Sequence, residues 1–245
     1  MQYPVPENLL LRAANAKLPL AAGKLVHVTF EAGQQLWRAD DTRPHAFFPL
    51  RGAVSLQLSP EGAKHVEIAL VGREGFAGVS LVAGSTRARM SGIAISDGEA
   101  FVMSSEVFRR YAAVPAFRAA LDRYTQLFVT MVSRILVCNR VHAIEKVCVG
   151  RLLFLQDRLK SDLLHMTQGV FAQQLGVRRA SISRVVAGLQ KAGAISYDKR
   201  GRITIRDRHH LEAMACTCYY SIKDEYDRLV TQQGGTRARS PKHRK

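Results

Sequence analysis

Apolar residues recur at helical spacing between residues 167 and 193, and the pattern predicts two short helices joined by a tight turn. Thr167 is placed to cap the first helix and Gly176 to end it. The second helix, predicted over residues 178–193, has one apolar face, made of Val177, Ile182, Val185, Val186 and Leu189. The segment therefore predicts a helix-turn-helix with a polar face left open on its second helix.

Residues 194–205 alternate between apolar and polar positions on either side of a turn at residues 198–201. This alternation predicts two paired strands. The turn carries Lys199 and Arg200, and Arg202 opens the second strand. A basic hairpin directly after a helix-turn-helix is typical of a winged helix-turn-helix.

Arginines and hydroxyl groups dominate the open face of the second helix, and such groups suit guanine edges and phosphates in a major groove. The candidate DNA-binding residues are Gln168, Arg178, Arg179, Ala180, Ser181, Ser183, Arg184, Lys199, Arg200 and Arg202. An ordinary helical hairpin with a solvated basic face is the alternative interpretation of the same pattern.

The charge favours a polyanionic partner. The 245 residues carry a formal net charge of +16, and from Cys148 onward there are nineteen Lys and Arg against eight Asp and Glu. A membrane surface would attract the same charge, but no apolar run approaches the roughly 18 residues that span a bilayer. No signal-peptide pattern is present at residues 1–20 either, so we expect a cytoplasmic protein without a membrane partner. Its four cysteines are then expected to be reduced thiols.

The N-terminal half has a different texture, with short strands separated by Gly, Pro and Asp turns. Strands are predicted over residues 25–30, 35–38, 46–50, 54–58, 66–71, 92–96 and 100–103. Evenly spaced short strands are typical of a sandwich or barrel, whose interior Phe47 and Phe48 would fill. A helix is predicted over residues 104–113, with Ser104 or Ser105 as its cap.

Pro115 begins a long helical pattern that runs to about Ile144 and carries an apolar stripe with alternating spacings of three and four. We expect this stripe to form a homodimer interface through Leu121, Tyr124, Phe128, Met131, Ile135 and Cys138. Packing of the stripe on the strand domain of the same chain is the alternative. Leu127, Val132 and Val141 widen the apolar surface enough for both contacts.

The complete pattern predicts an α+β fold with two domains. The predicted units are a β-roll sensor domain at residues 1–114, a dimerisation helix at 115–146, a winged helix-turn-helix domain at 147–231 and a disordered basic tail at 232–245. Further helices are predicted over residues 147–160 and 207–230. The tail would add nonspecific affinity for phosphates.

Metal binding and catalysis find little support in the sequence. Cys138 and His142 lie four residues apart and could ligate a metal with Cys148, but packing of an apolar stripe explains them as well. Cys216 and Cys218 would point to different sides of a helix. We therefore expect no metal site and no cofactor. The chain also lacks a GxxxxGK[ST] or HExxH motif, and an enzyme is not expected.

The order of these features resembles the Crp/Fnr family of bacterial transcription regulators over nearly the whole chain. The strings that carry the resemblance are residues 47–49 with 52–56, 71–75, 138–140 with His142, 157–158, 175–179, and 203–207 with 211–212 and 215–216. The resemblance implies that Arg179 and Arg184 contact base edges and phosphates and that Ser181 holds a phosphate. Ala180 stands where the best-known members have a glutamate, which implies a different target sequence. RNA polymerase is a further partner that the resemblance implies.

In cyclic-nucleotide-binding members of that family, one loop holds the cyclic phosphate through backbone N–H groups and an arginine. The matching effector-binding candidates in this chain are Gly75, Phe76, Ala77, Gly78, Arg87 and Arg89. Val79 stands where those members have a glutamate, and its side chain cannot accept a hydrogen bond from the ribose hydroxyl, so cyclic nucleotide binding is doubtful. A packed loop without a ligand explains the segment equally well. Because no cysteine precedes Cys138, the iron–sulfur cluster of oxygen-sensing members is not expected.

These features predict a homodimeric, sequence-specific regulator of transcription that binds operator DNA, with an unknown small-molecule effector. One alternative is a cyclic-nucleotide or small-anion binding module whose basic half serves a partner other than DNA. Another is an architectural protein that coats DNA without sequence preference.

Overall fold

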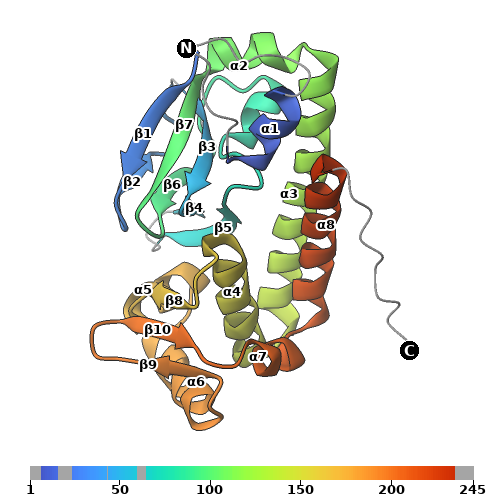
Figure 1. Ribbon diagram of the computed structural model, residues 1–245. Coiled ribbons are helices and arrows are strands. Elements are labelled where there is room, and N and C mark those ends of the chain that lie inside the picture. The colour runs from blue at the N-terminus through green and yellow to red at the C-terminus, as the bar shows by residue number, and fades with distance from the viewer. Residues whose placement is uncertain (1–6, 16–23, 43, 60–64, 235–245) are drawn as a thin grey trace.

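The computed structural model describes residues 7–15, 24–42, 44–59 and 65–234. Figure 1 shows an N-terminal β-roll and a smaller C-terminal domain, with the long helix α3 (Pro115–Val141) running from one to the other. The predicted α+β fold with two domains is confirmed. The residues of the predicted basic tail from 235 onward lie outside the described part of the chain.

Two antiparallel sheets form the β-roll. One has the strand order β1 (Val26–Phe30), β7 (Gly98–Ser104), β3 (His45–Arg51). The other has the order β2 (Gln35–Trp37), β6 (Ser91–Ala94), β4 (Val54–Leu58), β5 (Val66–Val71). Each of these strands overlaps one that the sequence pattern predicts, because turn residues separate them cleanly.

Aromatic rings fill the end of the roll where α1 (Leu9–Asn15), α2 (Ser105–Ala112) and α3 close it. The ring of Phe76 lies 5.3 Å from those of Phe48, Phe108 and Tyr124, measured between centroids. Ser104 caps α2 as predicted, and its Oγ accepts a hydrogen bond from the Val107 amide. The closed end is therefore a packed core.

The structure corrects the prediction that the apolar stripe of α3 forms the homodimer interface. The predicted interface residues pack within their own chain, against the β-roll and the C-terminal helix α8 (Thr217–Gly234). Ile135 is half-buried, and the others are buried: Leu121, Tyr124, Phe128, Met131 and Cys138. Side chains that already fill the core of one protomer are not available to a second. The alternative, packing on the chain's own strand domain, is the observed one.

Apolar side chains also lie on the opposite face of α3, where they are exposed. Val129 is 53% exposed, Leu136 70%, Val137 44% and Val141 65%. Large exposed apolar residues gathered along one helix are uncommon on a monomer. These four residues form the outer face of α3, which is the part of the helix left for another contact.

The C-terminal domain begins with α4 (Ile144–Leu159), which packs behind α5 (Gln168–Leu175) and α6 (Arg179–Lys191). The predicted hairpin, β9 (Ile195–Tyr197) and β10 (Arg202–Ile205), gains a third strand, β8 (Leu163–His165), which the sequence did not predict. A strand of three residues is too short to show an alternating pattern.

Two helices replace the single one predicted over residues 207–230. Asp207 caps α7 (Arg208–Met214), and the helix ends at Ala215, whose backbone is extended. Helix α8 then lies alongside α3 and returns toward the β-roll (Figure 1). Helix α8 therefore contacts elements of both domains.

Buried ion pairs hold the C-terminal domain to the β-roll. The Arg151 guanidinium on α4 lies 2.6 Å from the Glu67 carboxylate on β5. The Ser55 hydroxyl also donates to Glu67, and Arg151 donates to Gln174 on α5. Because buried polar groups need such partners, this network fixes the position of α4 and α5 beneath the roll.

Candidate DNA-binding surface and sensor pocket

Local capping sets the geometry of the helix-turn-helix. The Thr167 hydroxyl accepts a hydrogen bond from the Val170 amide, which caps α5 as predicted. Gly176 ends α5 with φ of +67°, a conformation that glycine adopts readily. The apolar face of α6 is buried, at Ile182, Val185, Val186 and Leu189. These contacts turn the opposite face of α6 outward.

Basic groups occupy that outward face. Arg178, which is the N-cap of α6, Arg179, Ala180 and Arg184 are all exposed, and Ser181 is half-buried. Within the described part of the chain no carboxylate forms an ion pair with the three arginines. Free guanidinium groups at the start of a helix can meet a polyanion without first breaking an internal contact.

Ser183 and Gln168, two of the predicted DNA-binding residues, interact with each other. The Ser183 hydroxyl donates to the Gln168 Oε1 at 2.5 Å, and both side chains are half-buried. This contact joins the N-terminus of α5 to α6.

The wing between β9 and β10 is held by Asp198. Its carboxylate accepts hydrogen bonds from the amides of Arg200 and Arg202 and pairs with the Arg202 guanidinium at 2.6 Å. The Arg202 amide, the Arg202 side chain and the Arg200 amide lower the pKa of Asp198. Lys199 and Arg200 remain exposed at the tip, whereas Arg202 is partly engaged in the turn.

Close backbone approach fixes the wing to α5. The Met166 amide donates to the Gly201 carbonyl at 2.7 Å, and Gly201 has φ of +77°. A Cβ on Gly201 would lie 2.8 Å from Thr167 Cγ2. The wing and α6 therefore present their basic residues from one rigid unit, as two neighbouring contacts for a duplex.

The structure corrects part of the predicted effector site. Phe76 and Ala77 are fully buried, and the Ala77 amide and carbonyl are bonded to the backbone of Phe47. The Tyr124 hydroxyl donates to the Phe76 carbonyl, and a Cβ on Gly75 would overlap the Tyr124 ring. Because this loop packs into the core, Gly75, Phe76 and Ala77 have no free surface for an effector.

Gly78, Arg87 and Arg89 lie nearer the surface. Gly78 and Arg89 line a small pocket of about 20 Å³, and the exposed Arg87 donates to the Asp40 carbonyl. The roll also has a larger hollow of about 340 Å³, lined in part by Gln34, Trp37, Asp41 and His45. No Lys or Arg is among its described lining residues.

Two family models match the chain, in the order in which the domains occur. Residues 27–113 match the model of the cyclic nucleotide-binding domain, and residues 148–214 match that of the Crp-like helix-turn-helix domain. Together the two ranges cover more than half of the sequence, and they coincide with the β-roll and with the surface described above. The chain belongs to the Crp/Fnr family. It is a DNA-binding regulator of transcription, as the resemblance in sequence implies.

Solved structures of Crp/Fnr regulators share the fold. FixK2 from Bradyrhizobium japonicum superposes with a TM-score of 0.66 at 14% identity, over 78% of this chain and 98% of that chain. The regulator TTHA1359 from Thermus thermophilus has a TM-score of 0.64 at 20% identity, over 78% and 98%. The c-di-GMP-responsive regulator CLP from Xanthomonas campestris has a TM-score of 0.62 at 14% identity, over 75% and 95%. None of the curated proteins compared with the chain matches it.

Helices α3 and α8 of this Crp/Fnr protein lie outside the two matched ranges. Helix α8, which packs along α3, begins after the last matched residue, so the family models do not account for it. No described helix, α8 included, combines the length and the apolar character needed to cross a membrane.

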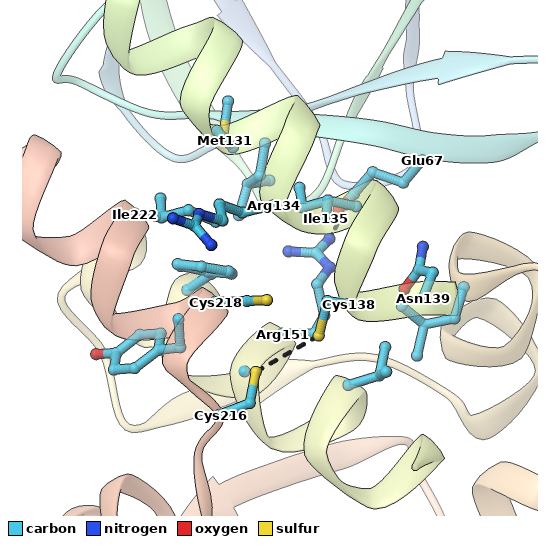
Figure 2. A pocket seen from close by; sticks show the side chains of 16 residues that line it. Glu67, Met131, Arg134, Ile135, Cys138, Asn139, Arg151, Cys216, Cys218 and Ile222 are labelled. Carbon is cyan, nitrogen blue, oxygen red and sulfur yellow. Dashed lines mark hydrogen bonds and ion pairs between the residues drawn. The ribbon is translucent and has the colours of Figure 1, made fainter. Parts of the chain in front are cut away.

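The structure also joins residues that the sequence analysis treated separately. A cavity of about 40 Å³ lies between α3, α4 and α8, and Figure 2 shows Cys138, Cys216 and Cys218 on its wall. The donor atoms of these cysteines and of His142 all lie within 4.8 Å of one another. Helical spacing predicts that Cys216 and Cys218 point to different sides, but Cys216 precedes the first residue of α8, so that spacing does not apply to it.

Proposed function

We propose that this regulator binds an inverted-repeat DNA site as a homodimer, with α6 of each protomer in a major groove. Arg179 and Arg184 are assigned to base edges and phosphates, and Arg178, Ser181 and Ala180 lie beside them. Gln168 and Ser183 orient the start of α5. Lys199, Arg200 and Arg202 of the wing contact flanking phosphates.

The observation that carries the proposal is the state of the α6 arginines. Arg178 at the N-cap and Arg179 and Arg184 in the first half of α6 are all exposed, and no described carboxylate forms an ion pair with them. Arginine is well suited to this role because its guanidinium can make two parallel hydrogen bonds to guanine O6 and N7. An unneutralised set of three at the start of the second helix supports binding to DNA with sequence preference.

The outer face of α3 supports the homodimer. Val129, Leu136, Val137 and Val141 are exposed along it, and a two-fold axis beside α3 would bury the same residues from both protomers. Symmetry would then place two copies of α6 about one turn of DNA, roughly 34 Å, apart. The spacing of the half-sites is therefore part of the proposal.

Control by an effector is assigned to the hollow of the β-roll. A ligand there can shift the two domains only if it binds one arrangement better than another. The chemical class of the effector is what the selection with added small molecules is designed to find. A contact with RNA polymerase would link DNA binding to transcription, and it stays a prediction.

Selection of sequences from a random duplex pool tests the proposal. We expect enrichment of an inverted repeat with half-sites about 10 base pairs apart, bound at least about 10³-fold more tightly than a scrambled duplex. Repeating the selection with candidate small molecules tests whether the β-roll responds to a ligand. Equal binding of all sequences would instead indicate an architectural protein, and no binding would favour a partner other than DNA.

Two substitutions separate the assigned roles. Arg179→Ala should abolish the sequence preference, whereas Lys199→Ala should weaken binding to all sequences alike and reduce the dependence of affinity on salt. Arg228→Ala removes an exposed arginine of α8 together with its surface ion pair to Glu225, and serves as the control for loss of one positive charge outside the helix-turn-helix. An Arg179→Ala protein that keeps full preference would contradict the assignment of α6.

A further inference from the structure

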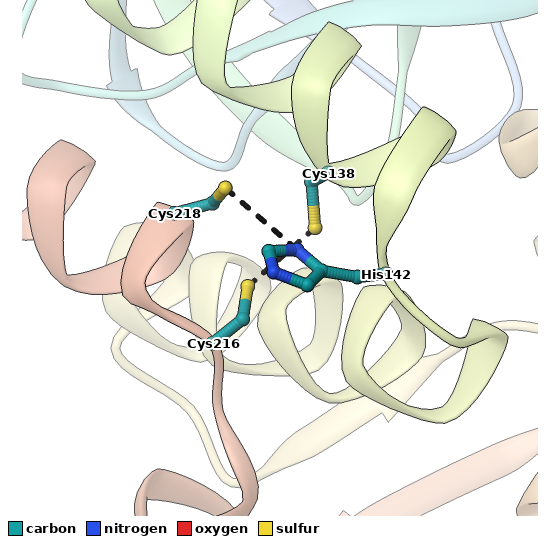
Figure 3. Close-up of side chains that lie close together, drawn as sticks. All are labelled: Cys138, His142, Cys216 and Cys218. Atoms are coloured by element: carbon teal, nitrogen blue, oxygen red, sulfur yellow. Dashed lines mark hydrogen bonds between the residues drawn. The ribbon is translucent and has the colours of Figure 1, made fainter.

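Three thiols and one imidazole meet where α3 ends and α8 begins. Cys138 lies in the last turn of α3, and His142 is the C-cap of that helix. Cys216 lies immediately before α8, and Cys218 is its second residue. Figure 3 shows all four side chains directed toward one point, although 78 residues separate Cys138 from Cys216 in the sequence.

The spacing of the donor atoms matches a single tetrahedral ion. With metal–sulfur bonds of about 2.3 Å and metal–nitrogen bonds of about 2.0 Å, two sulfurs on one Zn²⁺ lie about 3.8 Å apart, and a sulfur and a nitrogen about 3.5 Å apart. The Sγ atoms of Cys138 and Cys216 are separated by 3.5 Å, and Cys218 Sγ lies 3.8 Å from His142 Nδ1. The remaining pairs fall within 4.8 Å. Small rotations of the side chains would bring all four onto one sphere.

Packing alone gives little reason for this arrangement. The thiols of Cys138 and Cys216 are buried and face each other at 3.5 Å, and the Cys218 thiol and the His142 imidazole converge on the same point. A divalent cation would join these four donors, because it binds thiolates and displaces their protons.

We propose that Cys138, His142, Cys216 and Cys218 form a Cys₃His site for a structural Zn²⁺ ion. Four protein ligands complete a tetrahedron, so the ion has no open position for catalysis. The centre would carry one net negative charge, and Arg134, which lines the same cavity, supplies a neighbouring positive charge.

The site would fix the hinge between the two domains. Residue 143 alone separates the C-cap of α3 from α4, and the ion would tie this point to the first turn of α8. All four ligands lie outside the residues that match the family models, 27–113 and 148–214. The site is therefore a feature of this chain's own junction and its α8, and it does not depend on how the protein binds DNA.

Two other uses of the cysteines fit the geometry less well. An iron–sulfur cluster distributes its protein ligands over several iron atoms, whereas these four donors surround one point. A disulfide between Cys138 and Cys216 would require an oxidant and would leave Cys218 and His142 without a role. Both outcomes are distinguishable from zinc in the experiments below.

Metal analysis of the purified full-length protein is the first test. We expect one equivalent of zinc per chain and no absorption of visible light. After removal of zinc under reducing conditions, Co²⁺ should restore one equivalent of metal and give the intense visible bands of a tetrahedral cobalt–thiolate centre. Strong visible absorption with bound iron in the purified protein, or a Cys138–Cys216 disulfide found by peptide mass spectrometry, would overturn the proposal.

The fourth cysteine provides a matched control. Cys148 is fully buried on α4 and is not part of the cluster, so Cys148→Ser should retain the full equivalent of zinc. Cys138→Ser and Cys216→Ser should each lose most of it, and circular dichroism shows whether the variants fold. If they do not fold, titration of the metal-free wild type with Co²⁺ decides the question alone. A reduced, folded wild type that binds no Co²⁺ would contradict the site.

Discussion

The Arg158 guanidinium lies 3.0 Å from the Glu74 carboxylate, and both side chains are only 2% exposed. Glu74 follows β5 of the roll, and Arg158 is in the last turn of α4. Glu74 also accepts from the Gly72 amide, and Arg158 also donates to the Leu70 carbonyl. A buried ion pair with such additional partners fixes the position of the β-roll relative to the DNA-binding domain.

Glu74→Gln should lower the free energy of unfolding by about 3 to 5 kcal/mol, because it leaves the buried Arg158 charge without its partner. Chemical denaturation measures this loss. Asp122→Asn is the matched control, since it breaks the exposed ion pair with Arg118 on α3 and should cost less than about 1 kcal/mol. Equal effects of the two substitutions would show that the buried pair contributes no more than a surface pair.

Gly75→Ala should destabilise the β-roll, because the new methyl group would overlap the ring of Tyr124. The ring is fully enclosed and its hydroxyl is bonded to Phe76, so we expect a loss near the upper end of about 1 to 3 kcal/mol. Thermal unfolding measures it. Gly188→Ala in α6 meets no atom within 4 Å and should stabilise by about 0.5 to 1 kcal/mol. A neutral Gly75→Ala would contradict the close packing of this loop.

The helix-turn-helix could be predicted from the sequence because its signals are local. Thr167, Gly176 and the apolar face of α6 each act within a few residues, and the structure confirms all three. Helix α3 is different, since apolar residues lie on both of its faces. Helix α8 determines which face of α3 packs inward. Its position depends on the break between α7 and α8 at Ala215, and no Gly or Pro near Ala215 marks that break in the sequence.

Gly75 and the cysteines depend on contacts between distant segments in the same way. In the sequence, Gly75 suggests a loop that binds an effector. In the structure the ring of Tyr124 on α3 packs against Gly75, so the glycine is needed because a side chain would not fit there. Cys138 and Cys216 come together only because α8 folds back along α3. Contacts between distant segments determine both outcomes, and the spacing of residues along one element cannot reveal them.

The pKa of Asp198 should lie below its ordinary value of 3.8, chiefly because the Arg202 amide donates to its carboxylate. A folded-state pKa below the unfolded value means that the carboxylate stabilises the wing at neutral pH. That stabilisation is lost as the pH falls through the folded pKa. Titration of the carboxyl carbon by NMR measures the value.

Arg202→Ala provides the comparison for Asp198. The substitution removes the guanidinium but keeps both amide donors, so the pKa should rise only part of the way toward 3.8. A full return to the ordinary value would show that the side-chain ion pair, rather than the backbone of the turn, holds the wing.

The outer face of α3 is expected to form the homodimer, and Leu136→Glu should disrupt it. Leu136 is 70% exposed, so a charge there costs the isolated protomer little, whereas in a symmetric interface two carboxylates would be buried close together. Sedimentation equilibrium should show a dimer for the wild type and a monomer for the variant. When the dimer is lost, the affinity of the protein for an inverted repeat should fall, while its affinity for a single half-site should change little.

Val26→Glu is the matched control for that substitution, because Val26 is 61% exposed on β1, away from α3. It should leave the dimer intact. A Leu136→Glu protein that remains dimeric would place the interface elsewhere. The buried stripe of Leu121, Tyr124 and Phe128 could not replace it, because exposing those side chains to a partner would require the β-roll to separate from α3.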